Sequence, residues 1–352
     1  MKLKSLLIIL LSVFTLCISV DADAQSNKYK KRKQNNKKLA RYKGIRYSAG
    51  RFQPHFFLGA SINAGNYFGD LAPVSKKLST DISFTRPGFG FYGGYKFHHS
   101  LAVRGGINWV RVYGDDASTD PSVSENIGRY ARNLSFRNDI KEFQLGLEVY
   151  LFPNYGGPNQ RLPFNGYLFL GGAVFHHEPM GLVPDFDFQA EGLNATTAVP
   201  QAGEWVKLRP LETEGVSYKS ISFSIPISVG ATMRIPGTPL NAGIEFGVRY
   251  LFTDYIDDVS TNYVDLSGFS DPLGRIMSDR SAVPVDSNGD ARDLTGLGIS
   301  QLSNGFYSSG ASGAGLEGTQ RGNPDGDDFI FMTQLKLTYV MGGVIKRRAK
   351  YR

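Results

Sequence analysis

The segment SISFSIPISVGATMR, residues 220–234, decides the fold, because every second side chain in it is apolar. Ile221, Phe223 and Ile225 begin an apolar row that continues to Met233, while small, polar or charged residues and a proline fill the other row. A period of two places successive side chains on opposite faces of a β-strand. The segment therefore predicts a strand with one apolar face, longer than most strands of globular proteins.

The same alternation recurs along the chain and predicts eight strands in all. They fall at about 55–68, 88–98, 101–113, 140–152, 164–177, 217–234, 241–254 and 328–341. The connections after the second, fourth and sixth strands are short, and those after the other strands are long. This alternation, with an even strand number, is typical of outer-membrane barrels. We therefore predict an all-β fold, an eight-stranded antiparallel up-and-down transmembrane β-barrel with short periplasmic turns and long extracellular loops.

Composition agrees with an ordered chain rich in strands. Of the 352 residues, 41% are hydrophobic and 12% aromatic, enough apolar surface to exclude an intrinsically disordered protein. Only residues 6–20 approach the length and apolarity of a membrane-spanning helix, which excludes a helical transporter or channel.

The two ends of the chain differ from the body in charge. Residues 1–24 predict a signal peptide, with Lys2 and Lys4 before an apolar run and a small-residue cleavage site after it. We divide the rest into a basic periplasmic arm (25–52), the outer-membrane barrel (53–342) and a basic periplasmic tail (343–352). Such an arm is either a solvated segment or a contact for an acidic protein or anionic lipid headgroups; nucleic acid is not an expected partner. The basic arm residues are Lys30, Lys31, Arg32, Lys33, Lys37, Lys38 and Arg41.

The interior of an eight-stranded barrel is just wide enough to be filled by its own side chains. We expect the apolar faces to look outward at lipid and the charged residues to pair across the lumen, because a buried unpaired charge is costly. The competing interpretation is a secreted sandwich or lipocalin-like barrel with its apolar faces inward. If the charges do lie in the lumen, the alternative to a structural charge network is a proton or ion path through it. The predicted lumen charge network comprises Arg104, Glu142, Glu148, Arg234, Glu245, Arg249 and Lys336.

Signals for catalysis and metal binding are weak. The histidine pairs at 98–99 and 176–177 are adjacent on strands, so the two rings of each pair point to opposite faces. Residues 286–290 resemble the start of a calcium loop, but Leu297 stands where the bidentate acid belongs. We therefore predict no catalytic residues, no cofactor, no metal and no calcium in the loops.

Four stretches together carry a resemblance: YFGDL at 67–71, GDD at 114–116, RNLSFRNDIKEF at 132–143 and FTDYIDDVSTNYVD at 252–265. They resemble the Bacteroidota outer-membrane β-barrel family of PorG-like proteins, which is associated with type IX secretion and gliding motility and often known only as a domain of unknown function. The similarity covers about residues 55–342, and each stretch falls at the predicted extracellular mouth. The residues of this mouth motif are Tyr67, Gly69, Asp70, Leu71, Asp115, Asp116, Arg137, Asp254, Tyr255, Asp257 and Asp258.

The resemblance implies a non-enzymatic protein of the cell outer membrane that links a periplasmic ring or lipoprotein of the PorK/PorN type to outer-membrane lipid. On this hypothesis the two basic ends reach periplasmic partners, and the acidic mouth motif makes the long loops rigid. The alternative is a structural or adhesive surface barrel whose loops at 178–215 and 255–327 bind an external ligand. A small lipid- or peptide-modifying enzyme is the least supported interpretation, since no histidine or serine partner stands at a diagnostic spacing.

Overall fold

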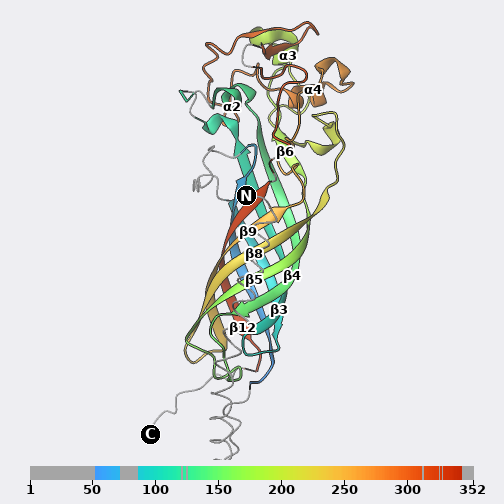
Figure 1. Ribbon diagram of the computed structural model, residues 1–352. Helices are drawn as coiled ribbons and strands as arrows, with labels where there is room; N and C mark the ends of the chain where they lie inside the picture. The colour runs from blue at the N-terminus through green and yellow to red at the C-terminus, as the bar shows by residue number, and fades with distance from the viewer. Residues whose placement is uncertain are drawn as a thin grey trace, which may run out of the picture. The chain divides into compact units, whose positions relative to one another are not determined.

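The computed structural model describes residues 52–71, 86–119, 122–123, 126–310, 313–324, 326 and 328–342. The predicted signal peptide, the basic arm up to residue 51 and the basic tail lie outside the described residues. Within them, eight strands close into an antiparallel barrel (Figure 1). In ring order these are β1 (His55–Phe68), β2 (Arg86–Lys96), β3 (Leu101–Asp115), β4 (Ser135–Tyr150), β5 (Phe164–His176), β8 (Ile221–Arg234), β9 (Leu240–Leu251) and β12 (Phe329–Val340).

The predicted fold is confirmed, including the alternation of short and long connections. Residues 97–100, 151–163 and 235–239 form the short turns at one end of the barrel, where β1 begins and β12 ends. There, the amide of Met341 donates to the carbonyl of Phe56. The long connections gather at the other end (Figure 1).

The apolar faces of the strands point outward. Ile62, Phe223 and Leu335 are 68%, 61% and 58% exposed, whereas Arg104 and Glu245 are buried inside the barrel. This direction contradicts the soluble-barrel alternative, in which the charged residues would be outside. The structure also shows which face of β5 points outward, a question that its sequence leaves open because both faces are apolar. The outward residues of β5 include Leu170 and Val174, and the inward ones are Tyr167, Phe169, Ala173 and Phe175.

Three of the long connections are folded rather than irregular in their described parts. We call their described parts, within residues 116–134, 177–220 and 252–328, the cap. The cap contains the short strands β6 (Pro179–Leu182), β7 (Trp205–Lys207), β10 (Ile299–Gln301) and β11 (Tyr307–Ser309), and the helices α2 (Ile127–Arg132), α3 (Phe188–Glu191) and α4 (Pro272–Ser278). It also contains the 3-10 turns η2 (Asp116–Ser118), η4 (Gly192–Asn194), η5 (Arg209–Leu211) and η6 (Leu266–Gly268). In the part of the chain that the structure describes, no helix has the length and apolarity needed to cross a membrane.

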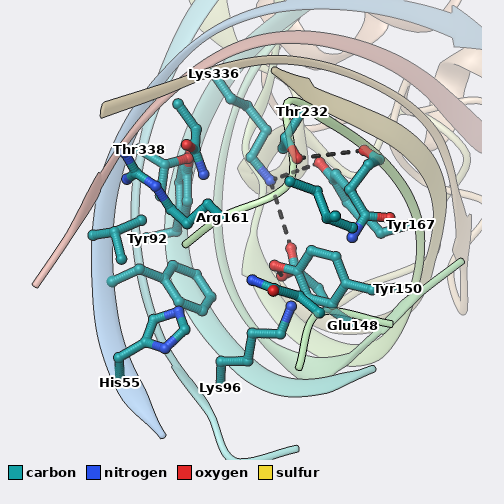
Figure 2. Close-up of a pocket in the computed structure, with 16 residues that line it drawn as sticks. His55, Tyr92, Lys96, Glu148, Tyr150, Arg161, Tyr167, Thr232, Lys336 and Thr338 are labelled. Atoms are coloured by element: carbon teal, nitrogen blue, oxygen red, sulfur yellow. Dashed lines mark hydrogen bonds and ion pairs between the residues drawn. The ribbon is translucent and has the colours of Figure 1, made fainter. Parts of the chain in front are cut away.

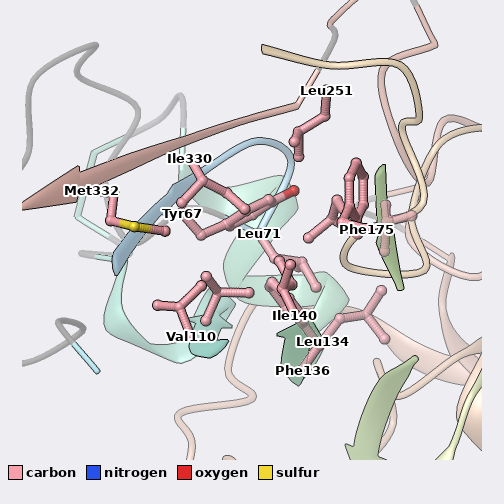
Figure 3. Close-up of a cluster of buried hydrophobic side chains, with 13 residues drawn as sticks. Tyr67, Leu71, Val110, Leu134, Phe136, Ile140, Phe175, Leu251, Ile330 and Met332 are labelled. Atoms are coloured by element: carbon pink, nitrogen blue, oxygen red, sulfur yellow. The ribbon is translucent and has the colours of Figure 1, made fainter. Parts of the chain in front are cut away.

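A hydrophobic core, which we call the apolar plug, fills the cap end of the barrel (Figure 3). Strand residues and loop residues contribute to it together: the Tyr67 ring packs edge-on against Phe136, with ring centroids 4.9 Å apart. The complete set is Tyr67, Leu71, Val110, Val112, Leu134, Phe136, Ile140, Phe175, Leu251, Ile256, Val259, Ile330 and Met332. The plug joins the cap to the barrel wall through ordinary core packing.

Candidate functional site

An ion layer crosses the lumen between the apolar plug and the short turns. The Arg104 guanidinium of β3 donates to Glu148 of β4 at 2.5 Å and to Glu245 of β9 at 2.8 and 3.0 Å. Lys336 of β12 donates to Glu245 at 2.7 Å, and the Tyr167 hydroxyl donates to the same carboxylate at 2.6 Å. Because β3 and β9 stand on opposite sides of the ring, the Arg104–Glu245 pair spans the barrel from wall to wall.

An ion pair and a group of hydrogen-bonded polar side chains lie between the ion layer and the plug. Glu142 of β4 and Arg249 of β9 form an ion pair, with 3.5 Å between Oε2 and Nε. Beside them, the Gln334 amide donates to Asn63 Oδ1 at 3.0 Å, and Ser61 donates to the same oxygen at 2.7 Å. From the ion layer to the plug the lumen is therefore occupied by side chains, and the charges in this part face partners inside it.

One residue expected in the lumen network lies elsewhere. Arg234 ends β8 and is half-buried, and its guanidinium donates to the backbone carbonyl of Arg161 at 3.0 Å. Its position in the strand explains the difference: it is the last residue before a short turn, so its long side chain reaches the neighbouring turn instead of the interior. The expectation that Arg234 joins the network was wrong.

At the cap end, the mouth motif surrounds a cluster of buried carboxylates. The Tyr67 hydroxyl lies 2.8 Å from Asp257 and 2.7 Å from Asp328. A hydroxyl has one proton to donate, so it can satisfy one of the two carboxylates. The other carboxyl makes a good hydrogen bond at this distance when it is protonated itself and donates to the hydroxyl oxygen. Burial, followed by the charge of a neighbouring aspartate, raises the pKa of both Asp257 and Asp328 well above the usual range. The structure thus favours a proton held within this cluster.

Gly69 and its neighbours fit closely around the same cluster. A Cβ atom at Gly69 would collide with the Tyr67 hydroxyl and with Asp328, so only glycine fits at this position. The Leu71 amide donates to Asp257 at 3.0 Å, and the Asn323 amide donates to Asp70 at 2.6 Å. These bonds fasten two long connections to each other at the barrel mouth.

The acidic pair at the end of β3 holds the connection to β4. Asp116 accepts from Arg132 at 2.7 and 2.8 Å and from the Leu134 amide at 3.1 Å. Asp115 caps η2 by accepting from the Ala117 amide at 2.9 Å. Arg137 does not join this cluster: it lies outside, with its guanidinium 4.4 Å from the Trp205 ring. Residues of even number in β4 face inward, so Arg137 points away from the mouth cluster, and the arginine that binds Asp116 is Arg132 of α2.

The last part of the motif anchors the longest connection. Asp258 accepts from the Tyr218 hydroxyl at 2.6 Å and from Thr213 at 2.5 Å. The Tyr255 ring stacks on Tyr218, with centroids 4.4 Å apart. Asp254 is half-buried, and its charge contributes to the raised pKa of Asp328. The motif residues after β9 therefore contact the connection between β5 and β8.

Asp258 provides a pH test of this arrangement. Burial raises the pKa of its carboxyl from 3.8 to about 6, although Arg321, Thr213 and Tyr218 oppose the change. A carboxyl with a raised folded-state pKa contributes stability fully below its unfolded pKa and loses it as the pH rises through about 6. We expect Asp258→Asn, which resembles the protonated form, to stabilise the cap by about 3 kcal/mol near neutral pH and by almost nothing near pH 4.

Hydrogen exchange of cap amides at the two pH values measures this difference. Asp290→Asn is the matched control, because Asp290 is an exposed aspartate of the same connection. A difference between Asp258→Asn and wild type that is constant with pH, or that has the opposite sign, would contradict the assignment.

The sequence interpretation missed three buried residues that complete the mouth. Arg321 donates to Glu214 at 2.8 Å and to the backbone carbonyl of Asp258 at 2.6 Å, and Asp328 faces Tyr67 as described above. Only the position of Asp328 could be read from the sequence, since it is the first residue of the last predicted strand, 328–341. Within the described ranges, no three histidine, cysteine, aspartate or glutamate side chains stand where they could hold a metal ion.

No family model and no curated protein matches the chain. Among solved structures it is similar to Ail, the attachment invasion locus protein of Yersinia pestis, in complex with the heparin analogue sucrose octasulfate (8% identity, 82% of this chain and 99% of that chain, TM-score 0.33). It is also similar to Neisserial surface protein A (8%, 82% and 98%, TM-score 0.33) and to a major outer membrane protein from Thermus thermophilus (12%, 81% and 99%, TM-score 0.34).

Proposed function

We propose that this protein is a non-enzymatic barrel of the outer membrane. The observation that carries the proposal is the outward apolar face found on each of the eight barrel strands, with Phe56, Phe89, Ile107, Phe143, Leu170, Phe223, Ile244 and Leu335 among its exposed members. In water, so large an apolar surface would drive aggregation. In a bilayer it faces hydrocarbon, and the closed hydrogen-bonded ring leaves no strand edge unpaired.

The filled lumen argues against a diffusion pore. Arg104 and Glu245 are buried and joined across the barrel, and the apolar plug lies beyond them. The purified protein in planar lipid bilayers is expected to show no steady conductance. Stable open channels of uniform size would contradict this part of the proposal.

Our finer proposal is a PorG-like role, in which the barrel links the periplasmic ring of a type IX secretion or gliding apparatus to the outer membrane. The support for it is the resemblance at the mouth motif, together with the position of the barrel's two ends beside the short turns. In outer-membrane barrels the short turns face the periplasm. The basic arm and tail would then start on the periplasmic side.

Affinity purification tests this role directly. The detergent-solubilised full chain is compared with a variant lacking residues 26–51, and a chain with Lys207→Gln, a substitution of an exposed cap lysine, serves as the matched control. We expect PorK/PorN-type proteins to copurify with the full chain and the control and to be reduced with the arm deletion. Recovery of no periplasmic ring protein or lipoprotein with any of the three would refute the linking role.

The cap favours a second candidate, a surface barrel that binds an external ligand. The long connections have hydrophobic clusters of their own, one of which contains Val183, Leu208 and Ile276, and buried ion pairs such as Arg275–Asp187 at 2.6 Å. Because such a cap is already folded, binding a ligand to its surface costs little conformational entropy. If replacing residues 178–215 by a short linker abolished attachment but left secretion normal, this candidate would replace the linking role.

A further inference from the structure

A small cavity lies in the lumen at the short-turn end, below the ion layer (Figure 2). Its volume is about 60 Å³, which is room for about four water molecules. Most of the residues that line it are polar or charged, and they include Lys96, Glu148, Asn154, Arg161 and Lys336. Figure 2 shows the side chains of Lys96 and Lys336 pointing toward one another, from strands β2 and β12, which lie on either side of β1.

Two of these cations, Lys96 and Arg161, form no ion pair within 4 Å with any carboxylate in the part of the chain that the structure describes. Lys96 is only 6% exposed, and among the described residues no carboxylate oxygen lies within 4 Å of its ammonium, although the charge of Glu148 acts on it from farther away. The ammonium lies over the face of the Tyr150 ring, 3.6 Å from Nζ to the centroid. The terminal nitrogens of Arg161 donate to the backbone carbonyls of Thr238 and Pro239 at 2.5 and 2.6 Å. Its Nε is buried and, in the described part of the chain, has no hydrogen-bond partner.

The ion layer does not neutralise these two charges. Arg104 and Lys336 are matched there by Glu148 and Glu245, which together leave no net charge. Lys96 and Arg161 therefore add an excess of positive charge at the cavity. Arg234 lies against Arg161 and adds to this excess. Buried charge of one sign is unfavourable unless a counter-ion compensates it.

We propose that this cavity binds one small oxyanion, a phosphate or carboxylate group, that enters from the short-turn end. Lys96 supplies the charge and Arg161 Nε supplies a directed donor, the combination that suits oxyanion recognition. The cavity has the size of a single such group, so larger molecules bind only through an oxyanion that reaches into it. Free inorganic phosphate and a carboxylate carried by a periplasmic molecule share this chemistry. The inference goes beyond the proposed function and does not depend on a linking role.

Calorimetric titration of the full chain in detergent tests the inference, with inorganic phosphate and acetate as separate probes at constant ionic strength. Wild-type protein is expected to bind at least one of them at a single site. Lys96→Met should weaken that binding about tenfold or more, because one charge-assisted hydrogen bond is lost. Lys219→Met, a substitution of an exposed cap lysine, is the matched control and should bind as wild type does.

Lys96→Met could change the stability of the barrel itself, so the second measurement is the change in melting temperature that each probe causes in each variant. Phosphate or acetate should raise the melting temperature of wild type and of Lys219→Met, but not that of Lys96→Met. Tighter binding of phosphate would identify a phosphate site, and tighter binding of acetate would identify a carboxylate site. Failure of both probes to bind wild type, or equal binding to the two lysine variants, would overturn the proposal.

Discussion

Glu245→Gln is expected to lower the free energy of unfolding by about 3 to 5 kcal/mol, because it leaves buried charges without their counter-charge. Glu245 is fully buried and accepts from Arg104, Lys336 and Tyr167. Glutamine has nearly the same shape, so the loss reports charge and hydrogen bonding and not the loss of volume.

Equilibrium urea unfolding in lipid or detergent measures this loss. Glu204→Gln, in an exposed position of the cap, is the matched control and should change the stability by less than about 0.5 kcal/mol. Adding Lys336→Met to Glu245→Gln should recover part of the stability, since it removes one unpaired cation. If Glu245→Gln behaved like the control, the ion layer would not be the structural centre of the lumen.

Phe136→Ala is expected to lower the free energy of opening the mouth by about 3 to 5 kcal/mol, through lost burial and a cavity in the apolar plug. Phe136 is fully buried and packs against Tyr67. Phe143 offers a matched control, since it is the same residue type on the same strand but faces outward and is 56% exposed.

Hydrogen exchange at mouth amides such as those of Leu71 and Leu134 distinguishes the two variants. Both amides donate to buried aspartates, so their protection reports whether the mouth is closed. Phe136→Ala should reduce this protection and Phe143→Ala should leave it unchanged. Equal effects of the two substitutions would mean that the plug does not hold the cap.

The strands could be predicted from the sequence because their side-chain pattern is imposed by a two-sided environment, lipid outside and polar lumen inside. The first strand was predicted at its observed bounds, 55–68. The fourth begins at Ser135, five residues before the predicted start. Its first residues pair with the end of β3 beyond the apolar belt, where outward side chains need not be apolar. Periodicity therefore failed where the two-sided environment ends.

The cap and the loop residues of the apolar plug could not be predicted, because they come from connections that have no period. Leu71 and Ile256 are buried only because three connections fold over the barrel mouth. One signal was available: the inward row of β3 changes from Arg104 and Asn108 to Val110 and Val112. That change marks the level at which a polar lumen becomes a hydrophobic core.

The direction of the side chains is the central claim, and methyl NMR in lipid nanodiscs tests it most directly. A lipid carrying a nitroxide in its acyl chain broadens the signals of methyl groups that touch the hydrocarbon. We predict strong broadening for Leu145, Val229 and Leu335, which are exposed on the barrel's outer face, and none for Val110 and Ile330, which are buried inside. Broadening of the inner methyl groups, with the outer ones unaffected, would contradict the account.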